Sequence, residues 1–361
     1  MMTFLMLQPC ERHHNLLPNP TVTENENVMT TYVTLAEIQA AAARIAGTAV
    51  RTPLVPLNLP NLPFEIFVKC ESAQPIGSFK LRGAFNMISQ LSPEQLAKGV
   101  ITYSSGNHAQ GVAYAARALG SKAVIVMPDN APQVKIDATR ELGAEVVFVG
   151  PASSARKLKA EELAAEHGYT IIPPYDHPHI LAGAATCGLE IMQQLPDVDL
   201  VLSPVSGGGL LSGTSTAVKL AAEEGLGNAA VKVFGVEPAL AADAKESFET
   251  KTLVEWPASS TTRTICDGLR TQSLGEINFE HILLHVDGII AVSEDEILAA
   301  MRTLLAHTDL IPEPSGAVTL AAALFHASEL PPAKKVAVIL SGRNVDPKLL
   351  ESLQNELAAS V

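Results

Sequence analysis

The sequence predicts an α/β fold with doubly wound, mainly parallel sheets. From residue 64 onward, short β-branched runs alternate with Ala-rich helical patterns, the order expected when each strand is followed by a helix. Several runs are continuously apolar instead of alternating with polar residues, which is typical of strands covered by helices on both faces. The length of 361 residues suggests one large or two ordinary domains and supplies ample material for a core.

Eight segments carry the strand pattern, being short and rich in β-branched and aliphatic residues. They lie at 64–70, 99–104, 122–127, 144–149, 169–172, 199–204, 231–237 and 335–341. Helical spacing of apolar residues predicts helices over 108–119, 132–142, 153–167, 181–195, 210–224 and 315–328. Another helix is expected to start at Ser78, whose hydroxyl suits an N-cap.

Composition limits the partners of the protein. A formal net charge of −13 argues against nucleic acid or an anionic membrane surface as the main partner. No stretch reaches the roughly 20 apolar residues of a membrane helix. The four cysteines, at 10, 70, 187 and 266, are scattered and indicate free thiols in a reducing, cytoplasmic location. We expect residues 1–28 to be a poorly ordered tail, with Met29 an alternative start.

A lysine stands at an unusual place in "QPIGSFKLRGAFNMI" (74–88). Lys80 falls in the first turn of the expected helix, where the positive end of the helix dipole disfavours a cation. Two interpretations are open. Lys80 is either a solvated surface charge or an amine whose pKa is lowered by burial, which would suit it to act as a nucleophile toward a carbonyl group.

Two polar or glycine-rich turns follow predicted strands, where ligands of doubly wound sheets bind. "SSGNHAQG" places Ser104, Ser105, Gly106, Asn107 and His108 before a helix, which forms either an anion cradle or an ordinary turn. "SPVSGGGLLSG" (203–213) is neither a P-loop nor a dinucleotide fingerprint, because no Gly-Lys-Ser/Thr follows and the third fingerprint glycine comes one place late. Its bare backbone suits the phosphate of a cofactor, unless the glycines only provide flexibility.

Two further segments carry weaker signals. In "GVEPALAADAKES" (235–247), Glu237, the Ala241 carbonyl and Asp243 offer oxygen ligands for Mg²⁺, Mn²⁺ or Ca²⁺, or else form a solvated acidic turn. In "ILSGRNVDP" (339–347), Ser341 stands at the end of the expected strand 335–341, and taken alone the segment indicates a plain turn. The histidines of "YDHPHI" (175–180) lack a partner cluster, and we expect a loop there instead of a metal site.

Taken together and in this order, "SFKLRGA", "SSGNHAQG", "SGGGLLSG", "EPALAAD" and "SGRN" resemble the serine/threonine dehydratase and serine racemase family. The resemblance covers about residues 34–350. It implies a pyridoxal-phosphate (PLP) enzyme of the tryptophan-synthase β fold, fold type II. It also implies a large domain of residues 29–102 and 177–361, a small mobile domain of residues 103–176, and a homodimer.

The resemblance implies a role for each cofactor-binding segment. Lys80 would hold PLP covalently and later take the α-proton of the substrate. Asn107 would hydrogen-bond the phenolic oxygen of the cofactor, and Ser341 would face its pyridine nitrogen. The phosphate would rest on the backbone of Ser206, Gly207, Gly208, Gly209 and Leu210.

Substrate and cation residues are implied in the same way. The turn of Ser104, Ser105, Gly106, Asn107 and His108 would receive the substrate carboxylate. Ser105 matches the acid/base of racemases in the family, on the face opposite Lys80. Glu237, Ala241 and Asp243 match a divalent-cation site, with Mg²⁺ or Mn²⁺ expected.

The implied activity is the elimination of water and ammonia from L-threonine and L-serine, which leaves a 2-oxo acid. Serine racemase and 3-hydroxyaspartate ammonia-lyase are the alternatives. Three departures from the family pattern are visible: Ser206 begins the glycine run, "SGRN" replaces "SGGN" at Arg343, and "AGAAT" (182–186) replaces "AGQGT". Because the chain ends near residue 361, we expect no regulatory domain and no feedback control by isoleucine.

Overall fold

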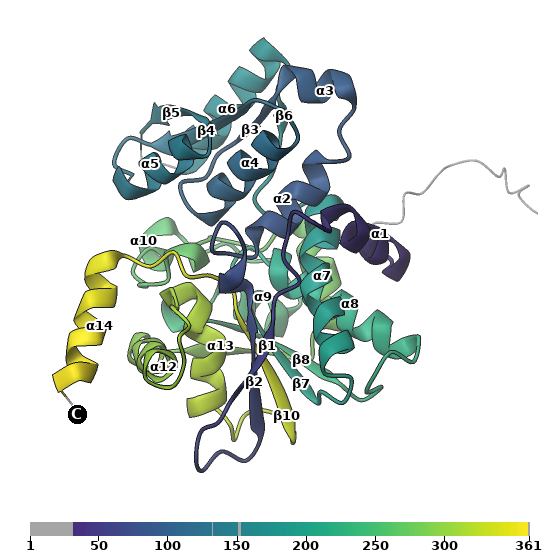
Figure 1. The fold of residues 1–361 in the computed structure, drawn as a ribbon, viewed down its shortest axis with the longest axis vertical. Helices are drawn as coiled ribbons and strands as arrows, with labels where there is room; N and C mark the ends of the chain where they lie inside the picture. Colours follow the sequence, from purple (N-terminus) through teal and green to yellow (C-terminus); the bar gives the residue numbers. More distant parts are fainter. Residues whose placement is uncertain (1–31, 132, 151–152, 360–361) are drawn as a thin grey trace, which may run out of the picture. The chain divides into compact units, whose positions relative to one another are not determined.

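The structure is a computed structural model that describes residues 32–131, 133–150 and 153–359. The expected N-terminal tail, residues 1–28, and the alternative start at Met29 lie outside the described residues. The described chain contains two sheets, each covered by helices (Figure 1). This confirms the α/β class and the parallel strand order expected from the sequence.

The larger sheet has six strands in the order β1-β2-β10-β7-β8-β9. All neighbours pair in parallel except β1, which is antiparallel to β2 at the edge. In spatial order the strands are β1 (Leu54–Leu57), β2 (Glu65–Cys70), β10 (Lys335–Leu340), β7 (Leu200–Pro204), β8 (Lys232–Pro238) and β9 (Gly288–Val292).

Helices cover both faces of this sheet, and alternate residues of the buried strand β10 show why. Ala337 and Ile339 join the core under one set of helices, whereas Val336 and Val338 join the core under the other. The first set is α1 (Leu35–Ile45), α7 (Pro178–Gln194), α8 (Gly209–Glu223) and α11 (Glu276–His285). The second set is α12 (Glu294–His307), α13 (Pro314–Phe325) and α14 (Pro347–Ala359). Figure 1 shows α7 and α8 on one side of the strands and α12 and α13 on the other.

The second sheet has four parallel strands in the order β5-β4-β3-β6. These are β5 (Glu145–Val149), β4 (Ala123–Pro128), β3 (Val100–Thr102) and β6 (Thr170–Ile171). One face packs on α2 (Lys80–Ile88), α4 (Asn107–Ala118) and α5 (Gln133–Glu141), and the other packs on α6 (Ser153–His167). The expected small domain of residues 103–176 stays a prediction. The strand β3 belongs to this sheet but ends at Thr102, just before the first residue of that expected domain.

The remaining helical segments connect these layers. They are α3 (Pro93–Lys98), α9 (Asp243–Thr250), α10 (Ala258–Thr261) and the 3₁₀ turns Glu71–Ala73, Ala239–Ala241 and Asp267–Leu269.

Two strands of the structure, β1 and β9, were not predicted from the sequence. β1 contains Pro56, which is compatible with an edge strand but weakens the strand pattern. β9, "GIIAV", is a run of five residues between two helices, too short to separate by periodicity from a helix end.

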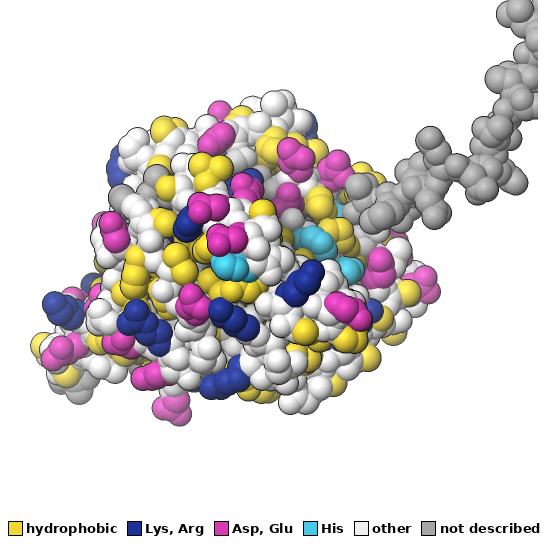
Figure 2. All heavy atoms as spheres, turned by 90° about the horizontal axis from the view of Figure 1, so that it is seen from above, with side chains coloured by type: hydrophobic (Ala, Val, Ile, Leu, Met, Phe, Trp, Pro, Cys, Tyr) yellow, Lys and Arg dark blue, Asp and Glu magenta, His cyan; other side chains and the backbone are white. Residues whose placement is uncertain are grey.

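The surface carries mixed charge. On the face drawn in Figure 2, acidic and basic side chains are interspersed, with no continuous basic area on that face. No helix in the described ranges is long and apolar enough to cross a membrane.

Candidate active site

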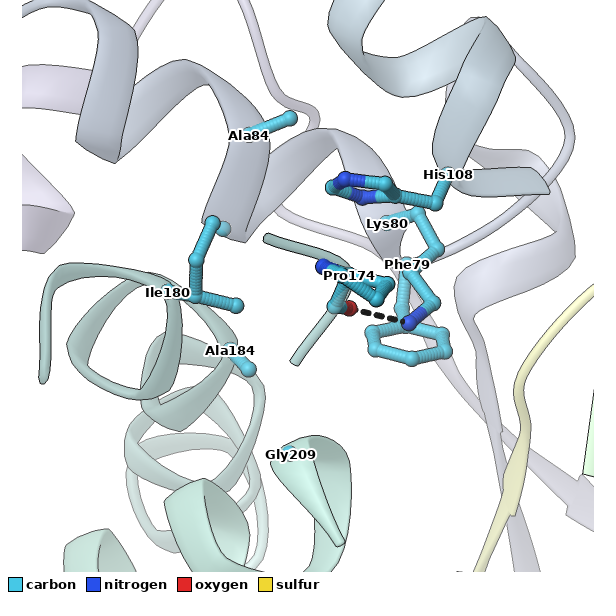
Figure 3. Close-up of a pocket in the computed structure, with 9 residues that line it drawn as sticks. Phe79, Lys80, Ala84, His108, Pro174, Ile180, Ala184 and Gly209 are labelled. Carbon is cyan, nitrogen blue, oxygen red and sulfur yellow. Dashed lines mark hydrogen bonds between the residues drawn. The ribbon is translucent and has the colours of Figure 1, made fainter. Parts of the chain in front are cut away.

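Lys80 is the first residue of α2, and its surroundings bury the amine. The turn before the helix is tied to the end of β10, because Phe79 N donates to Ser341 O at 3.1 Å and Ser78 forms a bridge with Gly342. Lys80 is partly buried, and its Nζ donates to the carbonyl oxygen of Pro174 at 2.7 Å (Figure 3). Burial lowers the pKa of Lys80 to about 8, so the amine loses its proton more readily than a surface lysine.

Lys80 and the glycine turn after β7 line one small cavity (Figure 3). Gly209 contributes from the start of α8, while Phe79, His108 and Ile180 close other sides. The structure therefore brings together two segments that are more than 120 residues apart in the sequence. Pro174 also lines this cavity, so a cofactor joined to Lys80 would take the place of the bond from Nζ to Pro174.

The turn from Ser206 to Gly209 offers backbone donors at the start of α8. Gly208 has φ of 91° and Ser206 has φ of 58°, so the turn needs a left-handed backbone at two positions; at a serine this costs about 1–2 kcal/mol. Gly208 N donates to Val205 O at 3.2 Å and is therefore not free for a phosphate, contrary to its implied role. Among the described residues, the N–H groups of Gly207, Gly209 and Leu210 have no acceptor. With the helix dipole, these groups fit an anion.

The turn of Ser104, Ser105 and Gly106 joins β3 to α4. Ser104 Oγ accepts from Gly106 N at 3.3 Å, and Ser105 is partly buried. His108, in the first turn of α4, is buried and its Nε2 lies 3.1 Å from Ile172 O. Burial and the nearby Lys80 lower the pKa of His108 to about 3, so this imidazole stays neutral and supports the turn.

Asn107 is held by two residues next to the larger sheet, Glu313 before α13 and Asn344 after β10. Its Nδ2 donates to Glu313 Oε1 at 2.8 Å, and its Oδ1 accepts from Asn344 Nδ2 at 2.7 Å. One Nδ2 hydrogen is left for a ligand, so the implied contact of Asn107 with a phenolic oxygen is compatible with these bonds.

The sequence prediction missed Glu313. This residue precedes the first residue of α13, is 3% exposed, and also accepts from Asn344 N at 3.0 Å. Burial raises the pKa of Glu313 to about 7. An acidic residue directly before a proline at a helix start ("EPSGA") is the sequence signal available for it.

Ser341 directly follows β10. It is buried, and its Oγ lies 3.5 Å from Ser315 O. Arg343 is exposed, and its backbone N donates to Gly77 O at 2.8 Å. The departure at Arg343 therefore lies against the turn that leads into Lys80.

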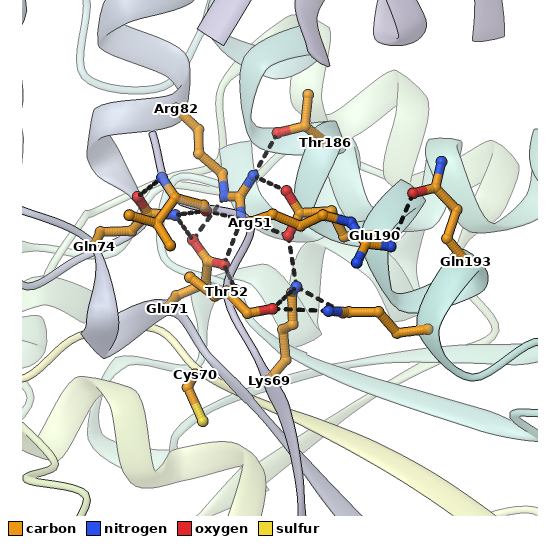
Figure 4. Close-up of polar contacts among 12 residues, drawn as sticks. Arg51, Thr52, Lys69, Cys70, Glu71, Gln74, Arg82, Thr186, Glu190 and Gln193 are labelled. Carbon is orange, nitrogen blue, oxygen red and sulfur yellow. Dashed lines mark hydrogen bonds and ion pairs between the residues drawn. The ribbon is translucent and has the colours of Figure 1, made fainter. Parts of the chain in front are cut away.

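A buried ionic cluster fixes the helix that carries Lys80 (Figure 4). Arg82, fully buried, donates to both oxygens of Glu71 at 2.7 Å and to Glu190 at 2.7 and 2.9 Å. Lys69 Nζ also binds Glu190, at 2.6 Å. Burial alone would raise the pKa of Glu71, but the ion pair with Arg82 outweighs it and lowers that pKa. The cluster joins α2 to α7 and to the end of β2.

Glu237 lies near the end of β8 and Asp243 begins α9, and both are almost fully buried. Glu237 Oε1 accepts from Lys245 N at 2.7 Å, whereas Asp243 Oδ2 is buried with no hydrogen-bond partner among the described residues. Burial and the neighbouring Asp243 raise the pKa of Glu237, and burial raises the pKa of Asp243 to about 7. Two buried carboxylates of this kind fit a divalent cation, which would neutralise both. Within the described ranges no group of three His, Cys, Asp or Glu side chains could hold a metal, so a backbone oxygen such as that of Ala241 would have to contribute.

Removing and restoring the cation tests this site. When folding raises the pKa of a carboxyl group, the folded protein loses stability as the pH rises from the pKa in the unfolded state to the pKa in the folded state. After EDTA treatment we therefore expect Mg²⁺ to raise the Tm by about 2–5 °C at pH 8 and by much less at pH 5, where protons occupy the carboxylates. Asp243→Asn is expected to abolish the response. A Tm that ignores EDTA and Mg²⁺ at every pH would contradict the site.

Comparisons with known proteins agree with this geometry. Residues 45–342 match the family model described as "Pyridoxal-phosphate dependent enzyme". The chain is 39% identical over 322 residues to an L-threo-3-hydroxyaspartate ammonia-lyase of Saccharomyces cerevisiae, covering 89% of this chain and 96% of that protein. It is 38% identical over 315 residues to a serine racemase of Schizosaccharomyces pombe, covering 87% and 94%.

The fold of this chain is also similar to that of solved structures. The crystal structure of a serine racemase from Dictyostelium discoideum superposes with a TM-score of 0.80 at 38% identity, covering 87% of this chain and 99% of that one. The fold, the lysine at the start of α2 and the matched family model all point in one direction, and the chain belongs to the pyridoxal-phosphate-dependent enzyme family.

Proposed function

We propose that this protein is a PLP-dependent ammonia-lyase that acts on L-threonine and L-serine. The observation that carries the proposal is the cavity shared by the deprotonatable Lys80 and the glycine turn. PLP, when bound, supplies the electron sink that makes the α-proton of an amino acid acidic. The protein then needs a base, an anion site for the phosphate, and a carboxylate site, and the described residues offer a candidate for each.

Each candidate has a task that follows from its surroundings. Lys80, with a pKa of about 8, can accept a proton near neutral pH and return it. The free N–H groups of Gly207, Gly209 and Leu210 would hold the phosphate. The turn from Ser104 to His108 would receive the substrate carboxylate. Glu313 and Asn344 hold Asn107, which would bind the cofactor through its remaining Nδ2 hydrogen. Ser341 would face the pyridine nitrogen; its hydroxyl is a weaker proton donor than a carboxylic acid.

In the net reaction the substrate loses its α-proton and its β-hydroxyl as water. The resulting enamine then takes up one water molecule when it is hydrolysed. The products are ammonia and a 2-oxo acid. A divalent cation at Glu237, Ala241 and Asp243 belongs to the proposal and would support the fold of the loop after β8. The homodimer, the cytoplasmic location and the small mobile domain also stay proposals.

Two other activities stay open, because relatives of similar identity are named for them. One is serine racemisation, with Ser105 as the acid/base opposite Lys80, and the other is ammonia release from 3-hydroxyaspartate. Incubating the purified protein separately with L-threonine, L-serine and L-threo-3-hydroxyaspartate, and measuring 2-oxo acid, ammonia and D-serine, ranks the three. The proposal expects 2-oxo acid and ammonia in equal amounts from threonine and serine. Faster turnover of 3-hydroxyaspartate than of threonine and serine would overturn the proposed activity in favour of the 3-hydroxyaspartate lyase. D-Serine as the main product would overturn it in favour of the racemase.

A variant of Ser105 separates the two faces of the site. If Ser105 is the acid/base on the face opposite Lys80, Ser105→Ala lowers the rate of racemisation by about 10²-fold or more and lowers elimination much less. Following D-serine and pyruvate in the same reaction measures both rates. Equal loss of both would contradict a role for Ser105 on one face.

A further inference from the structure

We propose that Asn278 is a positioning residue that holds the glycine turn in the shape that binds the cofactor phosphate. The inference rests on the proposed role of that turn. Asn278 lies on α11, 69 residues beyond Gly209, and is fully buried. None of the motifs in the sequence points to it.

Asn278 uses both ends of its side-chain amide. Nδ2 donates to Gly207 O at 2.9 Å and to Tyr175 O at 3.3 Å, and Oδ1 accepts from Ser212 Oγ at 2.9 Å. Because two carbonyl oxygens face one end of the amide, that end must be the NH₂ group, so the orientation of the amide follows from its partners.

These bonds fix one peptide plane of the turn at both ends. Gly207 O accepts from Asn278 Nδ2 and also from Gly275 N at 3.1 Å. In a planar trans peptide the following N–H points the opposite way, and Gly208 N does donate to Val205 O. With this plane fixed, the N–H groups of Gly207 and Gly209 on either side of it keep their directions whether or not an anion is present.

The position of Asn278 is itself fixed by the segment beside Lys80. The carboxylate of Asp176 accepts from the backbone N–H groups of Glu276, Ile277 and Asn278 at 3.1–3.3 Å. The ring of Tyr175 lies against Gly207, where a Cβ atom would be 2.5 Å from it. A Cβ on Gly208 would likewise lie 2.9 Å from the Asn278 side chain. The turn is therefore packed between Tyr175 and Asn278.

Substitution of Asn278 affects the turn in a defined way. Asn278→Asp keeps the shape but places a carboxylate against two carbonyl oxygens and close to the site of an anion. Asn278→Ala leaves the same two oxygens without this donor. In both variants the peptide plane between Gly207 and Gly208 loses one of its donors and is held only by Gly275 N and by the bond from Gly208 N to Val205 O. The expected loss of affinity therefore concerns the phosphate and not the rest of the cofactor.

The test compares PLP with pyridoxal, which lacks the phosphate. The protein, freed of bound cofactor, is titrated with each compound, and binding is followed by absorbance and fluorescence. We expect Asn278→Asp and Asn278→Ala to weaken PLP binding about tenfold or more and to change pyridoxal binding less than about twofold. The matched control is Asn228→Ala, since Asn228 Nδ2 donates to Val198 O beside the opposite end of β7; its ratio of PLP to pyridoxal affinity should equal that of wild type.

The outcomes separate this inference from the proposed function. Equal weakening of PLP and pyridoxal, or no weakening, in the Asn278 variants would overturn the positioning role while leaving the PLP site in place. A wild-type protein that does not prefer PLP over pyridoxal would overturn the role of the glycine turn, and this inference with it. If the Asn278 variants do not fold, Ser212→Ala serves instead, because it removes only the hydrogen-bond partner of Asn278 Oδ1. We expect this variant also to lower the preference for PLP over pyridoxal. An unchanged preference would contradict the inference.

Discussion

Replacing Lys80 with alanine is expected to lower kcat/KM by at least about 10³-fold and to abolish covalent attachment of PLP. The reason is that the described site has one partly buried amine beside the glycine turn, and burial lowers its pKa to about 8. Lys80→Arg is expected to lose activity as completely, because a guanidinium does not lose its proton in this range. Borohydride treatment of the loaded protein, followed by mass spectrometry of its peptides, locates the attachment.

Lys157→Ala is a suitable control for this experiment, because Lys157 is exposed and forms a weak i,i+4 pair with Glu161. It should bind PLP and turn over substrate like wild type. Attachment of PLP to a peptide without Lys80, or substantial activity in Lys80→Ala, would contradict both the site and the proposed function.

Arg82→Ala is expected to lower the free energy of unfolding by about 3–5 kcal/mol, because it leaves the fully buried carboxylate of Glu71 without its cation. Glu71 would lose two hydrogen bonds of 2.7 Å, and Glu190 would lose its two bonds from the same guanidinium (Figure 4). Arg82→Lys should lose less, since an ammonium keeps the charge but cannot make the paired contacts of a guanidinium. Urea unfolding followed by circular dichroism measures the difference.

Arg302→Ala provides the matched surface comparison. Arg302 also contacts a carboxylate through two nitrogens, since both Nε and Nη2 bind Glu356, but the two side chains are about one-third or more exposed. Its loss should cost at most about 1 kcal/mol. If Arg82→Ala cost no more than Arg302→Ala, the buried cluster would not be what fixes α2.

The stability of Arg82 variants also bears on the site. The α2 and α7 backbones touch, since a Cβ on Gly183 would lie 2.5 Å from Arg82 O. Lys80 lies two residues before Arg82 on the same helix. Movement of α2 after loss of the cluster would therefore shift Lys80 relative to the glycine turn.

Much of the fold could be predicted from local sequence. The strand at 335–341 and the helix at 210–224 are found as β10 and α8 with bounds that differ by a residue or so. Their signals are local, because a strand buried on both faces needs an apolar run and a helix needs apolar residues at 3.6-residue spacing. The edge strand β1 and the short β9 were missed, since pairing with a neighbour and not their own composition makes them strands.

The sequence by itself determined the α/β class, the family, and the turns at strand ends where Lys80 and Gly209 lie. Only the tertiary structure decided which residues surround them: Glu313 holds Asn107, and Asn278 holds Gly207. Each of these two partners lies more than 70 residues along the chain from the residue that it holds, so no local sequence pattern predicts the contact. A buried polar group takes its partner from whatever the packing brings within hydrogen-bond distance, and packing is a property of the whole fold.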